Sequence, residues 1–191
     1  MRIRTISLSS AALAAALVLA GCSDPGSGSG STADNSPSAQ ISSTTFNDAD
    51  ADFAMGMAAH HEQAIEMSDM LLAKDGVDRQ VVALAQKIKE AQGPGIETMN
   101  SWLEAWGVES DMQMDHRMMS GEDMGKLDAA SGADASSLFL EQMIEHHRGA
   151  VTMAEAEIDQ GNNADALALA QKIIDDQNAE IQKMQDLLET L

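Results

Sequence analysis

The chain has 191 residues and a formal net charge of −20 at pH 7, because 31 acidic residues are opposed by only 11 basic ones. A surface this acidic repels nucleic acid and anionic lipid headgroups, and it attracts cations over a distance set by the ionic strength. The chain contains one cysteine, which excludes a disulfide within the chain.

The N-terminus resembles the signal of a bacterial lipoprotein. Arg2 and Arg4 precede an apolar run from Ala11 to Ala20 that is too short to remain as a membrane-spanning helix. The run ends in Leu19-Ala20-Gly21-Cys22, which resembles the lipobox, where signal peptidase cuts before the cysteine and the cysteine carries the lipid. We therefore expect residues 1–21 to be a signal peptide, and the mature protein to be extracytoplasmic and lipid-anchored to the cell membrane through Cys22. The alternative is an ordinary signal with an accidental cysteine.

Residues 22–45 are expected to form a flexible tether. From Ser23 to Ala39 they are mostly Ser, Gly, Pro, Asp and Asn, a composition that cannot bury enough apolar surface to offset chain entropy. Residues 46–191 remain, which is enough for one domain with one core. If Cys22 is acylated, no thiolate is left, and a metal site in that domain has to use His, Met or carboxylate ligands.

The folded region is predicted to be all-α, because apolar residues recur three and four positions apart and strand-like alternation is absent. A first helix is expected from about Asp48 to Ala73 after the N-cap Asn47, and a second from Asp78 to Trp106. The stretch Gly93-Pro94-Gly95 should kink or break the second helix, since proline lacks the helical donor and clashes with the preceding turn.

Two further helices are predicted after a long connection at residues 107–133. The third runs from about Asp134 to Gln160 and is followed by Gly161, and the fourth runs from Asn163 to near the C-terminus. Short links within each helical hairpin imply antiparallel neighbours, so the predicted architecture is a four-helix bundle.

The two hairpins, residues 46–106 and 134–191, are predicted to be copies of one unit. Six residues of the first predicted helix recur at a constant offset in the third. The first set is Phe53, Met57, His60, His61, Ala64 and Met67, and the second is Phe139, Met143, His146, His147, Ala150 and Met153. Further along, Ala85-Gln86-Lys87-Ile88 recurs as Ala170-Gln171-Lys172-Ile173. A long period present twice indicates a duplicated helical hairpin.

Each set of six is predicted to lie on one face of its helix. At 100° per residue the first set falls within an arc about 120° wide, with His60 and His61 on either side of its centre. If the two helices share a core, four imidazoles and four thioethers can face one another. A single buried histidine is usually satisfied by hydrogen bonds, but four of them need many partners, which a metal can supply. The candidate metal ligands are Met57, His60, His61, Met67, Met143, His146, His147 and Met153.

The ligand types favour copper. Carboxylate-bridged di-iron bundles use Glu-x-x-His, but here methionine stands three residues before the first histidine of each pair, as in Met57-Ala-Ala-His60. Thioether in place of carboxylate disfavours iron, manganese and calcium and favours Cu(I) or Ag(I), whereas imidazole also suits Cu(II). The alternative role of methionine is to fill gaps in the core, which is the expected role of Met99 and Met184.

The connection at 107–133 carries a second Met/His-rich cluster. This connection is longer than the unstructured links of compact domains usually are. If it were unstructured, its methionines would be exposed to water, which is unfavourable unless they have a function. A second soft-metal site is one interpretation, and an acidic linker that packs its methionines over the bundle is the other. The candidate ligands are Met112, Met114, His116, Met118 and Met119.

Two segments, "FAMGMAAHHEQAIEMS" and "FLEQMIEHHRGAVTMA", with the Met/His-rich connection between them, resemble the duplicated motif of domain-of-unknown-function family 305. This resemblance implies a ferritin-like four-helix fold in exported bacterial proteins, some of which are associated with copper binding and copper tolerance. The family's motif positions correspond to the eight candidate ligands of the predicted bundle core. The stretch Gly93-Pro94-Gly95 is a departure from the family pattern.

Together these features predict an extracytoplasmic lipoprotein that binds Cu(I) or Cu(II) for sequestration, storage or transfer to a partner protein, and that is not an enzyme. One rival is a ferritin-like metal oxidase in which Glu62, Glu66 or Glu145 joins the histidine pairs. Another is a structural or signalling envelope lipoprotein whose histidines form a hydrogen-bonded network. Because imidazole binds metal only when neutral, an unperturbed pKa of about 6.5 predicts loss of copper below about pH 6.

Overall fold

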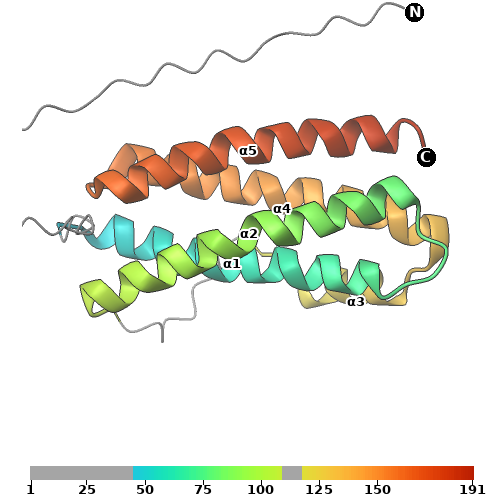
Figure 1. The fold of residues 1–191 in the computed structure, drawn as a ribbon, viewed down its shortest axis with the longest axis horizontal. Helices are drawn as coiled ribbons and strands as arrows, with labels where there is room; N and C mark the ends of the chain where they lie inside the picture. The colour runs from blue at the N-terminus through green and yellow to red at the C-terminus, as the bar shows by residue number, and fades with distance from the viewer. Residues whose placement is uncertain (1–44, 109–117) are drawn as a thin grey trace, which may run out of the picture. The chain divides into compact units, whose positions relative to one another are not determined.

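The computed structural model describes residues 45–108 and 118–191, which form five helices (Figure 1). They are α1 (Asp48–Leu72), α2 (Arg79–Trp106), α3 (Gly121–Ala129), α4 (Gly132–Gln160) and α5 (Ala164–Leu188). These ranges contain no strand, so the prediction of an all-α fold is confirmed. The count of four helices was wrong by one, because the short α3 lies in the connection. The expected signal peptide, Cys22 and the tether up to residue 44 lie outside the described residues.

The four long helices begin and end close to their predicted bounds, and side-chain caps begin three of them, α1, α2 and α5. Asn47 and Asp50 form a capping box at α1, in which Asp50 N donates to Asn47 Oδ1 at 3.0 Å and Asn47 N donates to Asp50 Oδ2 at 2.6 Å. The side chains of Asp78 and Asn163 cap α2 and α5. Gly107 ends α2 at a φ of 68°, a left-handed conformation that suits glycine.

Helix α2 runs through Pro94 without a break. Proline removes the bond that would reach the carbonyl of Glu90, but both residues are exposed, so water can replace that bond. The hydroxyl of Thr98 donates to the carbonyl oxygen of Pro94 at 2.8 Å. Of the two outcomes expected for this stretch, the broken helix is therefore excluded.

The two predicted hairpins, α1–α2 and α4–α5, pack against each other through α1 and α4. Figure 1 shows α1 and α4 running in opposite directions. Accordingly, the start of α1 lies at the end of α4, where Asn47 Nδ2 donates to the carbonyl of Gln160 at 2.9 Å. Close packing thus joins α1 to α2, α4 to α5 and α1 to α4.

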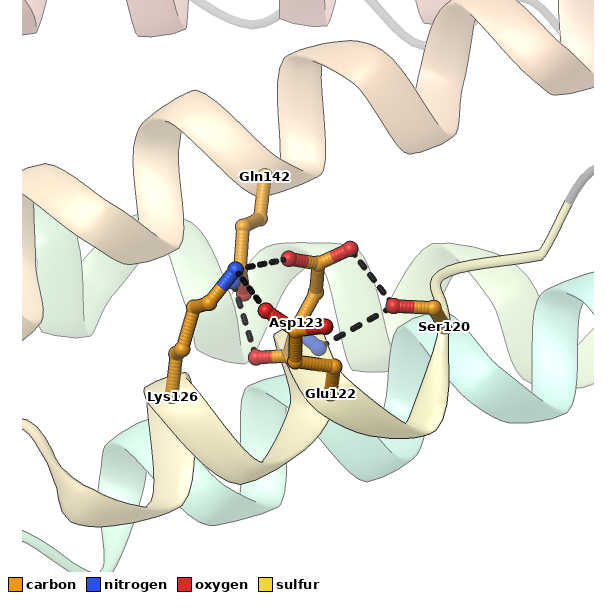
Figure 2. Close-up of polar contacts among 5 residues, drawn as sticks. All are labelled: Ser120, Glu122, Asp123, Lys126 and Gln142. Atoms are coloured by element: carbon orange, nitrogen blue, oxygen red, sulfur yellow. Dashed lines mark hydrogen bonds and ion pairs between the residues drawn. The ribbon is translucent and has the colours of Figure 1, made fainter.

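Helix α3 packs on α1 and α4. Figure 2 shows its attachment: Gln142 Nε2 of α4 donates to the carbonyl of Asp123 at 2.9 Å. Ser120 caps the helix by accepting from Asp123 N at 3.1 Å, and Lys126 pairs with Glu122 at 3.0 Å and Asp123 at 2.9 Å (Figure 2). Its two buried side chains join the core, so the connection is held by apolar as well as polar contacts.

The core consists of two apolar clusters. The Leu71 cluster joins the end of α1 to the start of α4, and it includes Met67, Leu71, Leu127, Phe139, Met143 and Met184. The Trp102 cluster joins the start of α1 to the end of α4, and it includes Phe53, Met57, Met99, Trp102, Ala150 and Ala154. Within the described ranges, no helix is long and apolar enough to cross a membrane.

Candidate metal centre

The four paired histidines lie together in the middle of α1 and α4. Their residues are 0% to 4% exposed, and the rings of His60 and His146 lie 3.6 Å apart between centroids, at an interplanar angle of 32°. The rings of His146 and His147 are 6.4 Å apart. Residues that are distant in the chain are thus brought to one place by the antiparallel contact of the two helices. We call this group, His60, His61, His146 and His147, the histidine layer.

The candidate methionines flank the histidine layer from both sides. On α1, Met57 belongs to the Trp102 cluster and Met67 to the Leu71 cluster. On α4 the order is reversed: Met143 belongs to the Leu71 cluster, and Met153 packs against the Trp102 cluster. Each cluster therefore contributes one methionine from each helix. Met57, Met67 and Met143 are fully buried, whereas Met153 is only partly buried.

One carboxylate from α5 contacts the histidine layer. Glu180 Oε2 lies 2.6 Å from His147 Nε2, and since a carboxylate accepts, His147 donates from Nε2. In the neutral ring this leaves Nδ1 of His147 with the lone pair. Such a carboxylate–histidine pair is the arrangement that fixes the tautomer of many metal-binding histidines.

Several ring nitrogens of the layer are buried without a hydrogen-bond partner among the described residues. They are Nδ1 of His61, Nδ1 of His147 and both ring nitrogens of His146. A buried polar atom without a partner is unfavourable, and each neutral ring has one nitrogen with a lone pair, so that nitrogen fits a ligand that accepts the lone pair. A soft metal cation is such a ligand.

Two rings of the layer, those of His61 and His146, have a lowered pKa. Burial lowers the pKa of His61 to about 4, and the neighbouring His147 lowers it further. Burial also lowers the pKa of His146 well below its usual value, and the nearby histidines His60, His147 and His61 add to this effect. Because only neutral imidazole binds a metal, both rings are in the ligating form at pH 7.

Nitrogen and oxygen ligands alone do not complete a site. Among the described residues, no group of three or more His, Cys, Asp or Glu side chains is arranged to hold a metal ion. A zinc or iron site of the usual kind needs such a group. The flanking clusters add thioethers next to these imidazoles, which is the ligand mixture predicted for copper.

The carboxylates expected for a metal oxidase lie elsewhere. Glu62, Glu66 and Glu145 are exposed, and Glu145 forms an ion pair with Arg148. Glu180 is a carboxylate that does contact the layer, and the sequence interpretation missed it. A signal was present, because Glu180 shares the helical spacing of the buried residues Ile173, Gln177 and Met184. An acidic residue on such a face has to meet a polar partner.

The second candidate cluster is described only in part. Met112, Met114 and His116 lie outside the described residues. Met118 is 41% exposed. Met119 packs against the Leu71 cluster, and its backbone is held by Gln63, whose Nε2 donates to Met119 O at 3.0 Å and whose Oε1 accepts from Met119 N at 2.7 Å. For Met119 this matches the alternative of methionines packed over the bundle, and a metal site here stays a prediction.

The arrangement on these helices is that of a known family. Residues 50–188 match the family described as Domain of unknown function (DUF305). The chain belongs to the DUF305 family. The resemblance found in the paired histidine segments is thereby confirmed. No curated protein matches the chain.

Solved structures of DUF305 proteins are similar to this one. A DUF305 protein from Streptomyces coelicolor, described as a candidate secreted protein, is 34% identical, with a TM-score of 0.70 over 74% of this chain and 91% of that chain. A DUF305 fragment from Deinococcus radiodurans is 27% identical, with a TM-score of 0.70 over 76% of this chain and 98% of that one. CopM in its Cu(I)-bound form is 28% identical, with a TM-score of 0.63 over 74% of this chain and 96% of that one. CopM has also been solved bound to Cu(II) and to Ag.

Proposed function

We propose that this DUF305 protein binds copper outside the cytoplasm and sequesters it, stores it or transfers it to a partner protein. The observation that carries the proposal is the histidine layer: four buried imidazoles between two methionine-bearing clusters, with ring nitrogens of His61, His146 and His147 that have no hydrogen-bond partner among the described residues. The ligands would be His60, His61, His146 and His147 with Met57, Met67, Met143 and Met153. Lipidation at Cys22 would hold the protein at the cell membrane.

Ligand chemistry and the related structures support copper over other metals. Thioether and imidazole suit Cu(I), and imidazole also suits Cu(II), whereas iron, manganese and calcium favour carboxylates. CopM, which is similar over most of its length, binds Cu(I), Cu(II) and Ag. The acidic surface would raise the local concentration of any cation.

The same observations support binding rather than catalysis. A di-iron oxidase needs carboxylates among its ligands, but Glu62, Glu66 and Glu145 are exposed. A purely structural lipoprotein would need hydrogen-bond partners for the buried ring nitrogens of His61 and His146, and none is found among the described residues.

The first prediction is that the mature protein holds Cu(I) much more tightly than Fe(II) or Mn(II). A competition titration against a Cu(I) chelator, run beside titrations with Fe(II), Mn(II) and Zn(II), measures this preference. Met143→Leu should weaken Cu(I) binding by roughly tenfold or more, because it removes a thioether while nearly keeping the volume. Met184→Leu is the matched control, since Met184 is equally buried in the same cluster, and it should bind as the parent does. Equal or tighter binding of Fe(II) would refute the proposal.

A further inference from the structure

A cavity of about 180 Å³ lies between α2 and α5. These two helices are not among the closely packed pairs, and the cavity occupies the space between them. Its outer lining includes the exposed residues Lys172 and Asp176, and its inner lining includes His61 of the histidine layer. Glu180, the partner of His147, also lines it. The cavity therefore extends from the surface to His61 and to the carboxylate that contacts His147.

The lining carries buried acceptors without partners. His61, Gln92 and Gln177 are each 4% exposed, and His61 Nδ1 and both amide oxygens have no hydrogen-bond partner among the described residues. Unpaired buried oxygens are unfavourable in an apolar wall, but they are useful where a cation or water passes. The two glutamines occupy equivalent positions in the duplicated hairpins, one on each side of the cavity.

One helical turn after these glutamines, the two copies of the hairpin have different residues at equivalent positions, and this difference opens the cavity. Glu180 of α5 and Gly95 of α2 occupy equivalent positions, but Glu180 reaches His147 whereas Gly95 has no side chain. A Cβ atom on Gly95 would lie 3.1 Å from Cδ2 and 3.3 Å from Nε2 of His61. Any larger residue would push against this ring and occupy the space in front of it. Because of Gly95, His61 borders the cavity directly.

We infer that the cavity between α2 and α5 is the route by which a soft monovalent cation reaches the histidine layer, with His61 as the first imidazole that it meets. The inference rests on the proposed copper binding and adds the path and its direction. Gln92, Gln177 and Glu180 offer oxygen atoms along the way, and the layer then takes the ion with stronger ligands. Lys172, which pairs with Asp176 at the outer end, is a positive charge that opposes an approaching cation.

The test of the route is the rate at which Ag(I) binds and dissociates, not the affinity of the protein for Ag(I). Ala91 is exposed and lines the cavity, so Ala91→Trp should narrow the route without touching the layer. Ag(I) association and dissociation, followed by stopped flow with the mature protein, should both slow by about tenfold or more, while Kd stays within twofold, because a barrier changes both rates equally. Asn100→Trp is the matched control, since Asn100 is exposed on the opposite face of α2. Rates of Ala91→Trp equal to those of the parent would overturn the route.

A charge variant gives an independent test. Lys172→Gln removes the positive charge at the outer end and should speed Ag(I) association about twofold at low ionic strength, with the gain lost in high salt. Lys126→Gln is its control, because Lys126 is also an exposed, ion-paired lysine but lies on α3. Equal acceleration by both variants would contradict the route. If the parent binds neither Ag(I) nor Cu(I), the proposed function and the route both fail, whereas binding with unchanged variant rates refutes the route alone.

Discussion

His61 shows how burial of one residue couples the pH of the medium to folding. Its pKa is about 4 in the folded protein, against 6.5 for an ordinary histidine, chiefly because burial disfavours the charged ring. As the pH falls below 6.5, the unfolded chain therefore takes up a proton before the folded chain does. The stability that neutral His61 supports is complete above about pH 6.5 and is lost as the pH falls toward 4.

We therefore predict that, in the metal-free protein, each such histidine removes up to about 1.4 kcal/mol of stability per pH unit as the pH falls from about 6.5 to 5. His61→Gln should lose less over this interval, because glutamine does not titrate. Urea unfolding at the two pH values measures the difference, and Glu62→Gln, an exposed neighbour on α1, serves as the control. An identical loss in the parent and in His61→Gln would show that this ring is not responsible.

The low pKa also revises the expected pH dependence of copper binding. The unperturbed value placed the loss of affinity below about pH 6. In the folded protein, protons compete for His61 only near pH 4, and burial lowers the pKa of His146 well below that of an ordinary histidine. This correction could not come from the sequence, because it depends on how completely the surrounding helices remove water from the rings.

Other residues of the site differed in how far they could be predicted. The burial of His60, His61, His146 and His147 followed from helical spacing, since adjacent residues share a buried face only when they straddle its centre. The contact of Glu180 with His147 depends on how α5 is rotated against α4, which spacing within one helix does not determine. For the same reason Gly95 was interpreted only as a helix breaker, and its position against His61 was missed.

At the scale of the elements, short-range signals gave the bounds of the long helices. The caps Asn47, Asp78 and Asn163 act within one helical turn, so the start of each helix can be predicted from neighbouring residues in the sequence. Helix α3 was missed because its nine residues bury only Met124 and Leu127, and both depend on α1 and α4 for their burial. Isolated helices of this length are not stable, so tertiary packing decides whether one forms.

A buried carboxyl pair links the start of α1 to the end of α4. Asp50 is fully buried; burial opposes its ionisation, but hydrogen bonds from the backbone of Asn163 and Asn47 lower its pKa. Glu157 is 1% exposed, and burial together with Asp50 raises its pKa to about 8. At pH 7 Glu157 is therefore mostly protonated, next to the Asp50 carboxylate.

This pair predicts a stability change opposite in sign to that of His61. Glu157 keeps its proton to about pH 8 when folded but loses it near 4.5 when unfolded, so its contribution is largest at low pH and is lost between pH 4.5 and 8. Glu157→Gln, which keeps a neutral amide at every pH, should reduce the loss of stability from pH 6 to pH 9. Chemical unfolding at these two pH values tests it, with the exposed Glu155→Gln as control. The expectation fails if Glu157→Gln and the parent lose equal stability on going to pH 9.

At the scale of the whole molecule, duplication explains both the site and its opening. Two copies of one hairpin, packed antiparallel through α1 and α4, place two histidine pairs together with methionines on both sides. A duplicated site with identical surroundings would be equally closed on both halves. The difference between Gly95 and Glu180 leaves His61 bordering a cavity, while His147 is covered by a carboxylate.

The central claim is that copper binds within the histidine layer. A crystal structure of the mature protein loaded with one equivalent of Cu(I), with an anomalous difference map at the copper edge, tests it most directly. We predict one dominant peak among His60, His61, His146 and His147, with at least one methionine sulfur of the flanking clusters in its coordination sphere. A dominant peak outside the layer, or a peak in the layer with nitrogen and oxygen ligands only, would contradict the account.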